Sequence, residues 1–473
     1  MVFSSLIFVF LFFPLYLLAY RLVPTGWRNP VLLVASLVFY GWGGPQYLIL
    51  LVGETFIAWA FARLMGPDPE GRRPRWPLVS ACALLLGLLA YFKYWGWLSG
   101  MTVALFGLPV FLPEVLLPIG ISFYTFQLIS YVADVWKGEV EVQRAFWKLL
   151  LYSSLFFQCI AGPIVRYETV AGEIDRRHAS RTDIYLGLRR FCVGLAKKSV
   201  LANGCASVAD TLLPIGSEAL ATQAVTGYWL GMAFYMLQIY LDFSAYSDMA
   251  IGMGRMVGFH FLENFDYPYI SRSVREFWHR WHISLSTFFR DYVYFPLGGS
   301  RCSTAKTIRN LAVVWFLTGL WHGASWNYVL WGLYFLAFLL LERYVLRSLG
   351  ESWLGLLYAL VVVFFGWVLF RFESFSELGT VVAGLFGATR GAFSSLEVQT
   401  IFTEHLFLLI VSIIACTPLS RRLRSALGRI GRNGGVGAQL LGIEEFVVPV
   451  FTLVVSVAAL AGASYNPFIY FQF

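Results

Sequence analysis

The strongest constraint on the fold is a series of long runs that contain no Asp, Glu, Lys or Arg. Only 13% of the residues are charged, against about 25% in soluble proteins, and ~20 residues of helix cross a bilayer core. The runs do not alternate between polar and apolar residues, which argues against a β-barrel. They cover residues 1–20, 30–53, 77–92, 115–133, 149–165, 219–241, 310–341, 353–370, 406–420 and 446–473.

We therefore expect an all-α, polytopic membrane protein with about 10 to 13 transmembrane or re-entrant helices. No linker, repeat or soluble insertion is visible, so residues 1–473 are predicted to form a single integral-membrane domain. The Gly-Gly-Pro sequence from Gly43 to Pro45 predicts two short helices joined by a hairpin within 30–53. Amphipathic helices are expected around 184–214.

Basic residues between the apolar runs predict the orientation of the chain. Three groups fall on one side, the cytoplasmic side, if the N-terminus lies outside and the hairpin at 43–45 returns outward. A further cluster near the C-terminus is also expected to be cytoplasmic. Topology thus explains the net charge of +8, and no nucleic acid is expected as a partner. The basic residues are Arg21, Arg28, Arg63, Arg72, Arg73, Arg75, Lys137, Arg144, Lys148, Arg421, Arg422, Arg424, Arg429 and Arg432.

The segment 263–309 is unusually polar for its place between apolar runs. Such a segment lies at the cytoplasmic interface or lines a water-accessible cavity, because lipid does not satisfy exposed backbone groups. Two adjacent glycines, Gly298 and Gly299, follow Pro296 near its end. Re-entrant helices joined by a tight turn would fit this pattern.

The 32-residue run 310–341 carries the first candidate for chemistry. One straight helix of that length would extend ~48 Å, beyond the ~30 Å hydrocarbon core, so a break is expected at His322-Gly323-Ala324-Ser325. An ionisable residue at apparent membrane depth is a functional candidate. A neutral imidazole there is a suitable general base for a hydroxyl proton. The alternative is a core histidine that donates to a backbone carbonyl.

His282 is the second candidate. On spacing alone, a catalytic role and an interfacial histidine bonded to its surroundings are equally open. His279 would share a helix face with His282, and Glu276 could complete a metal site on that face. No second ligand cluster stands out and the neighbouring sequence is rich in arginine, which disfavours a cation. We therefore expect no metal.

The arginines around His282 suggest an anionic group at the cytoplasmic mouth, such as the phosphates of a nucleotide or carrier cofactor. Positive-inside topology with ion pairs to Glu276 and Asp291 is an equally open alternative. The stretch 240–248 adds two carboxylates and several hydroxyls, which contact substrate directly or support the site from behind. Asp242 is assigned the supporting role. The arginines are Arg272, Arg275, Arg280 and Arg290.

Three motifs resemble those of the membrane-bound O-acyltransferase (MBOAT) superfamily, in particular its bacterial alginate O-acetyltransferase branch. They are WHGASWNYVLWG around His322, EFWHRWHISLSTFFRDYVYFPLGGSR around His282, and YLDFSAYSDMAIG. The similarity extends over almost the whole chain, from MVFSSLIFVFLFFP through LLPIGISFYTFQLISYVADV to the terminal NPFIYFQF.

The resemblance implies that His322 is the catalytic histidine and that His282 matches the second histidine of bacterial relatives. It also implies a ring of helices around a central funnel, in which a cytoplasmic acyl donor meets an extracytoplasmic acceptor. We expect Arg280, with its neighbours Trp281 and Ser284, to contact the donor. Trp321 is expected to support the site together with Asp242.

The expected function is transfer of acetyl from a cytoplasmic thioester to hydroxyls of an extracytoplasmic, alginate-like exopolysaccharide, directly or through a partner protein. Acetyl-CoA or another acyl thioester is the expected donor, and no tightly bound cofactor is expected. His322 would act as general base, and His282 would orient the donor or stabilise the oxyanion.

The expected partners are an extracytoplasmic acetyltransferase or relay protein, a polysaccharide-synthesis complex and membrane lipid. The expected location is the bacterial cytoplasmic (inner) membrane, which the chain would cross several times. Two other classes stay open. One is a transporter or lipid-linked sugar flippase that relays protons through His and Asp, and the other is a non-catalytic membrane scaffold of a polysaccharide-modification complex.

Overall fold

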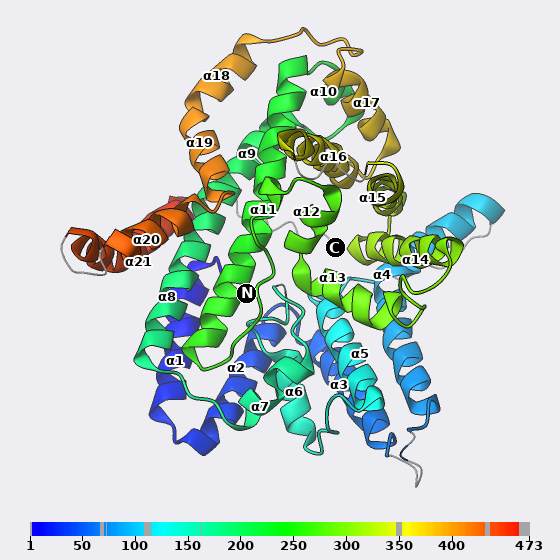
Figure 1. The fold of residues 1–473 in the computed structure, drawn as a ribbon, viewed down its shortest axis with the longest axis vertical. Helices are drawn as coiled ribbons and strands as arrows, with labels where there is room; N and C mark the ends of the chain where they lie inside the picture. Colours follow the sequence, from blue (N-terminus) through cyan, green and yellow to red (C-terminus); the bar gives the residue numbers. More distant parts are fainter. Residues whose placement is uncertain are drawn as a thin grey trace. The chain divides into compact units, whose positions relative to one another are not determined.

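The computed structural model describes residues 2–66, 71, 73–107, 115–160, 162–346, 352–430 and 436–462. Within these residues the chain folds into helices, turns and loops and contains no strand (Figure 1), so the all-α prediction is confirmed. Arg72, Arg432 and the end of the last apolar run lie outside the described residues.

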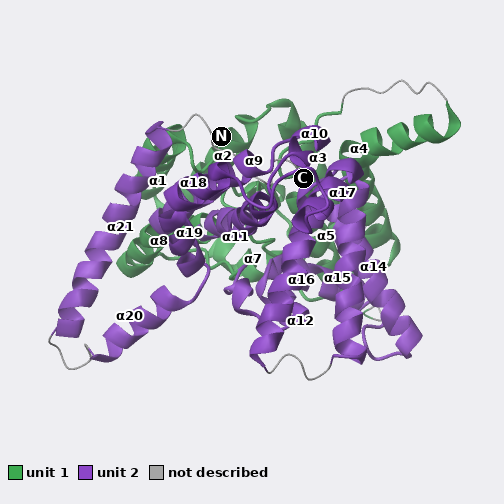
Figure 2. Ribbon diagram, turned by 90° about the horizontal axis from the view of Figure 1, so that it is seen from above, with its two compact units in different colours: residues 1–191, 249–263 green, residues 192–248, 264–473 purple. Residues whose placement is uncertain are grey.

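The chain forms two compact units, which Figure 2 colours separately. The first consists of Met1–Phe191 and Met249–Glu263, and the second of Cys192–Asp248 and Asn264–Phe473. That residues 1–473 form a single domain stays a prediction.

Helices of the first unit surround an interior rich in aromatic rings. They are η1 (Phe8–Phe12), α1 (Phe13–Leu22), η2 (Thr25–Trp27), α2 (Arg28–Gly41), α3 (Gln46–Arg63), α4 (Trp76–Phe106), α5 (Ile121–Lys137), α6 (Phe146–Ser154) and α7 (Tyr167–Asp175). The α3 helix contacts α4, α5 and α6, and α2 contacts α1 and α6. The ring of Phe39 lies 5.7 Å from that of Phe8 and 5.4 Å from that of Phe156. The helix break predicted between Gly43 and Pro45 is confirmed, because α2 and α3 are separate helices on either side of it.

Two helices, α8 (Arg181–Ala196) and α11 (Val225–Met256), run from one unit into the other. The helices predicted around 184–214 are confirmed as α8, the π-helix η3 (Lys197–Ala202) and α9 (Asn203–Leu212).

In the second unit, the short α12 (Val274–Arg280), α13 (Ile283–Phe289) and η5 (Arg290–Tyr294) form the polar segment predicted between 263 and 309. The α15 helix (Trp326–Tyr344) lies between α14 (Thr304–His322) and α16 (Trp353–Arg371) (Figure 2). The remaining helices are α10 (Ser217–Ala221), η4 (Pro268–Ile270), α17 (Phe375–Leu385), α18 (Leu396–Glu404), α19 (Leu406–Ala415), α20 (Leu419–Ile430) and α21 (Val436–Gly462).

By length and composition, three helices among the described residues could cross a membrane. They are α4, α16 and α21, and the pair α18 and α19, bent by 55°, counts as a fourth if it is one broken span. The other apolar runs fold into helices that fall short of this length or apolarity. The expected number of about 10 to 13 transmembrane or re-entrant helices stays a prediction.

The predicted break within 310–341 is confirmed, since α14 ends at His322 and α15 begins at Trp326. The connection of three residues turns the chain back on itself, so that α14 and α15 pack against each other. The long apolar run is thereby divided between two helices of 19 residues each, which extend beyond its two ends.

Two glycines allow α14 and α15 to approach closely. A Cβ atom added at Gly319 would lie 2.4 Å from the backbone oxygen of Tyr328, and one added at Gly332 would lie 2.3 Å from that of Trp315. Small residues at helix crossings let backbones come this near in membrane proteins. The hairpin that carries His322 at its turn therefore depends on these two positions.

Gly332→Ala should lower the stability of the purified chain by ~1–3 kcal/mol, because the new methyl group would collide with rigid backbone. The measurement is the thermal unfolding midpoint in detergent. Gly442→Ala in α21 is the matched control, because a Cβ there meets no atom within 4 Å. Alanine has the higher helix propensity, so the control should unfold at the wild-type temperature or slightly above it. Equal midpoints for the two variants would contradict the close packing.

Candidate active site

The two histidines selected from the sequence lie against the same tryptophan in the second unit. The ring centroid of Trp321 is 5.6 Å from that of His282 and 5.0 Å from that of His322. His282 is 1% exposed, His322 2% and Trp321 4%. Both imidazoles are thus buried and lie against the same indole ring.

His322 is the last residue of α14 and is surrounded by aromatic rings. The ring of Trp331, from α15, lies 4.8 Å from the imidazole, and that of Phe370, from α16, lies 5.1 Å from it. Trp321, the preceding residue of α14, completes this environment. Three neighbouring helices therefore surround one titratable ring with aromatic side chains.

His282 stands just before α13 with a backbone conformation that side chains rarely adopt. Its φ is 43° and its ψ 56°, in the left-handed region, which costs about 1–2 kcal/mol for a residue other than glycine. The N–H of Ile283 donates to the backbone oxygen of Asn264 at 3.0 Å and so ties this turn to a distant loop. Strain of this kind persists where the surrounding structure enforces it, often at functional sites.

The side chain of Asn264 fixes the orientation of the His282 ring. Its Oδ1 accepts the backbone N–H of Ser284 at 3.2 Å and the Ser284 hydroxyl at 2.9 Å, while its Nδ2 donates to Ser247 Oγ at 3.3 Å. A backbone N–H can only donate, so these contacts identify the amide oxygen. Nδ1 of His282 lies 3.2 Å from that same oxygen.

It follows that Nδ1 of His282 carries the proton and Nε2 carries the lone pair. Nε2 is buried and has no hydrogen-bond partner among the described residues. His282 lies outside the candidate spans, and burial lowers the pKa of its ring to about 3. The ring is therefore neutral near pH 7 and presents a hydrogen-bond acceptor.

This tautomer bears on the two roles predicted for His282. An oxyanion needs a hydrogen-bond donor, whereas Nε2 here is an acceptor. Orienting a substrate through its N–H or O–H group is the role that this tautomer serves.

Asp242 lies behind His282 in a buried ion pair. Its carboxylate is 2.7 Å from Nζ of Lys198, and the two side chains are 2% and 3% exposed. The next residue on α11, Phe243, packs against the imidazole of His282 with ring centroids 4.7 Å apart. The supporting role of Asp242 stays a prediction, and this arrangement gives it a route through Phe243.

The residues expected to contact the acyl donor lie next to His282 in different surroundings. Arg280 donates to Glu276 at 3.0 Å and to Asp266 at 3.1 Å. Its guanidinium group therefore already forms ion pairs with two carboxylates. Trp281 is buried, with its ring 4.8 Å from that of Trp367. Ser284 is bonded to Asn264, as described above. Donor contact by these residues stays a prediction.

A metal ion would require several ligands in one place. In the part of the chain that the structure describes, no three His, Cys, Asp or Glu side chains are grouped in that way. Glu276, considered above as a ligand beside His279, accepts from Arg280 Nε and from the backbone N–H of Arg272 at 2.8 Å.

Two residues of the site were not selected from the sequence. Asn264 lies 18 residues before His282, and Lys198 is 44 residues before Asp242. A buried lysine next to a buried aspartate signals an ion pair only after the fold has brought them together. Asn264 lies within the polar segment 263–309, which is the only signal that pointed to it.

Comparisons with known proteins give the same assignment. Residues 145–378 match the profile of MBOAT, the membrane-bound O-acyltransferase family. The chain is 37% identical to the probable alginate O-acetylase AlgI of Pseudomonas putida, over the whole of both chains. It is 30% identical to the peptidoglycan O-acetyltransferase of Helicobacter pylori, over 82% of this chain and 80% of that one. A teichoic acid D-alanyltransferase of Bacillus subtilis is 29% identical over 46% of this chain and 56% of its own length.

The predicted family is thus confirmed by similarity that extends from one end of the chain to the other. The apolar helices, the buried histidine pair and the full-length relatives agree with one another. This chain belongs to the membrane-bound O-acyltransferase family and is an acyltransferase of that class.

Proposed function

We propose that this acyltransferase moves acetyl from a cytoplasmic thioester, acetyl-CoA or a related donor, to hydroxyls of an extracytoplasmic polysaccharide of the alginate type. The main support for this proposal is that the buried imidazoles of His282 and His322 both pack against the indole ring of Trp321. Full-length similarity to a probable alginate O-acetylase supports the choice of acetyl and of the polymer.

The reaction needs one proton acceptor and an apolar pocket. The acceptor hydroxyl attacks the thioester carbonyl, its O–H proton passes to His322, a C–O bond forms and the C–S bond breaks. The thiolate leaves with the proton that His322 returns, so that a thiol and an ester are the products. A general base in this position contributes ~10²–10⁴ in rate.

His282 orients a reactant by accepting a hydrogen bond at Nε2. Both substrates can supply the donor group, since a polysaccharide carries hydroxyls and coenzyme A carries amide N–H groups. The strained backbone at His282 and the bonds from Asn264 hold Nε2 in a fixed direction, which is how a positioned group lowers the entropy of the reacting complex.

The proposed location is the bacterial inner membrane, with the basic loops in the cytoplasm. An acetyl donor made in the cytoplasm and a polymer outside it require transfer across that membrane. We propose an extracytoplasmic acetyltransferase or relay protein, associated with a polysaccharide-synthesis complex, as the recipient when transfer is not direct.

His322→Ala should reduce acetyl transfer from radiolabelled acetyl-CoA by at least ~10²-fold in reconstituted membranes, because the base is lost. His282→Ala should also reduce it. His405→Ala is the matched control and should retain wild-type transfer, because His405 stands between α18 and α19 and, among the described residues, its imidazole bonds to the backbone oxygen of Ile401 at 3.0 Å. Full transfer by His322→Ala would argue for a scaffold. No transfer by wild type with any acceptor or partner would argue for another donor or for transport.

Asn264 is proposed as a positioning residue, and its variants should separate the effect of geometry from that of charge. Asn264→Leu removes the acceptor for His282 Nδ1 and should lower kcat by roughly tenfold or more. Asn264→Asp keeps an oxygen acceptor and should restore part of the rate at alkaline pH.

The pH profile distinguishes this role from a merely structural one. A carboxylate at 264 stabilises imidazolium, so it raises the pKa of His282 from its low value. Nε2 is available only above that pKa, so transfer by Asn264→Asp should fail at a higher pH than transfer by the wild type as the solution is acidified. A profile identical to that of the wild type would contradict the contact with Nδ1.

A further inference from the structure

The first unit contains a polar cavity that is separate from the histidine pair in sequence and composition. Its volume is about 460 Å³, within the range of small-molecule sites. It lies where the end of α1 and the start of α2 meet the end of α7. Its lining includes Tyr20, Arg28, Asn29, Arg176 and Arg177.

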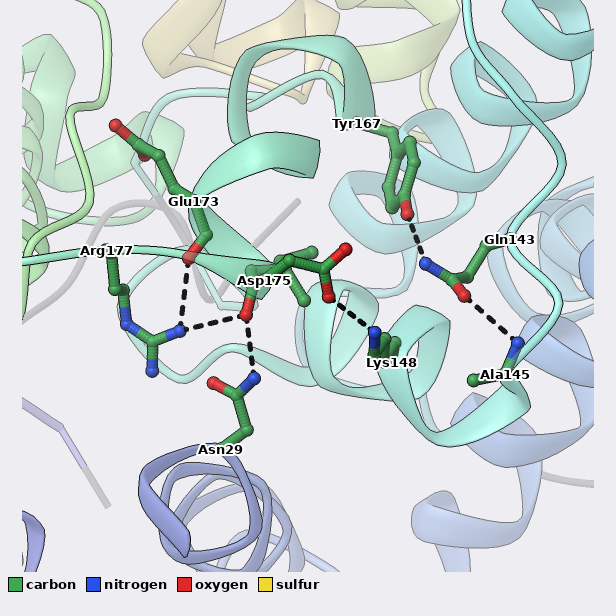
Figure 3. A network of polar contacts seen from close by, with 9 residues as sticks. Asn29, Gln143, Ala145, Lys148, Tyr167, Glu173, Asp175 and Arg177 are labelled. Carbon is green, nitrogen blue, oxygen red and sulfur yellow. Dashed lines mark hydrogen bonds and ion pairs between the residues drawn. The ribbon is translucent and has the colours of Figure 1, made fainter. Parts of the chain in front are cut away.

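The acidic groups near the cavity already have partners other than its arginines. Asp175, which also lines the cavity, is 2.5 Å from Nζ of Lys148 (Figure 3). The carboxylate of Glu173 is 2.7 Å from Nδ1 of His260. The arginines therefore leave the cavity with an excess of positive charge.

Arg177 is held in place by neutral oxygen atoms. Its Nη1 donates to the backbone oxygen of Glu173 at 3.2 Å, as Figure 3 shows, and to that of Ile174 at 3.4 Å. Its Nε donates to the hydroxyl of Tyr20 at 3.1 Å. Its Nη2 is buried and has no hydrogen-bond partner within the described ranges. A fixed, cationic donor is thus available to a ligand.

Two more arginines of the cavity have no ion-pair partner in the part of the chain that the structure describes. They are Arg28, whose Nε is buried without an acceptor, and the exposed Arg176. Planar guanidinium groups suit phosphate oxygens, which accept several charge-assisted hydrogen bonds at once.

The cavity also contains one unused acceptor. Nδ2 of Asn29 donates to the backbone oxygen of Ile174 at 2.7 Å, which identifies the other side-chain atom of the amide as Oδ1. This Oδ1 is buried and has no partner among the described residues. A ligand hydroxyl could donate to it.

We propose that this cavity binds a phosphate ester that carries a hydroxyl group. The arginines take the phosphate, and Asn29 accepts from the hydroxyl. Such a group occurs in the headgroup of phosphatidylglycerol and in soluble esters such as glycerol 3-phosphate. Arg28 and Lys148 are among the basic residues predicted to face the cytoplasm, where both sources are accessible.

The test measures binding of both probes to the full-length chain in nonionic detergent. Retention of phosphatidylglycerol relative to phosphatidylcholine is followed by native mass spectrometry, and glycerol 3-phosphate by isothermal titration. In Arg28→Gln/Arg176→Gln, binding of the responsible probe should weaken by about tenfold or more. Neither side chain has an ion-pair partner that its loss would strand, so this double variant should fold.

Arg144→Gln/Arg181→Gln is the matched control. It removes the same two charges from exposed positions of the first unit that do not line the cavity. If the cavity variant selectively loses binding of phosphatidylglycerol, the cavity is a lipid site. If it selectively loses binding of glycerol 3-phosphate, the ligand is soluble. If neither probe distinguishes the cavity variant from the control, the proposal is wrong. Binding is measured without acetyl transfer, so this result does not depend on the function proposed above.

Discussion

The amide of Asn264 ties together the second unit's reactive region, because it contacts four polar groups there: Nδ1 of His282, the backbone N–H and the hydroxyl of Ser284, and the hydroxyl of Ser247. Water does not reach such groups in an apolar interior, and each unsatisfied one costs about 1–3 kcal/mol. Its oxygen accepts from the turn at His282 and from Ser284, and its Nδ2 donates to Ser247. The same bonds stabilise a left-handed residue and select the tautomer, so that structural support and chemical function share one side chain.

The helical class and several helix breaks could be predicted from the sequence, because they follow from comparing the lengths of the uncharged runs with the length of helix that crosses a bilayer. A run of 32 residues exceeds the bilayer, so the turn after His322 was expected and is present. His282 and His322 were selected from motifs and a resemblance. The fold then brought both of them against Trp321, and no spacing rule predicts this contact. Asn264 escaped notice because its importance depends on a contact across 18 residues and on the direction of one N–H.

The π-helix η3 illustrates how a local irregularity can position charges. Lys197 and Lys198 are adjacent, yet each pairs with its own aspartate of α11, Asp248 at 2.8 Å and Asp242 at 2.7 Å. The Lys198–Asp242 pair is buried, so removing one partner would strand the other charge, and this loss costs more than the pair itself contributes to stability. These two ion pairs fix the register of η3 along α11. They thereby also fix the position of Phe243 against the imidazole of His282.

The position of His322 at the very end of α14 has an electrostatic consequence. The last turn of a helix carries a partial negative charge on its free carbonyl groups. During the proposed reaction the imidazole gains a positive charge, and the helix end then attracts it. Stabilisation of this kind is largest when the surroundings are apolar, as they are here, where Trp331 and Phe370 cover the ring. In the proposed reaction, the backbone of α14 would thus stabilise the imidazolium form of His322.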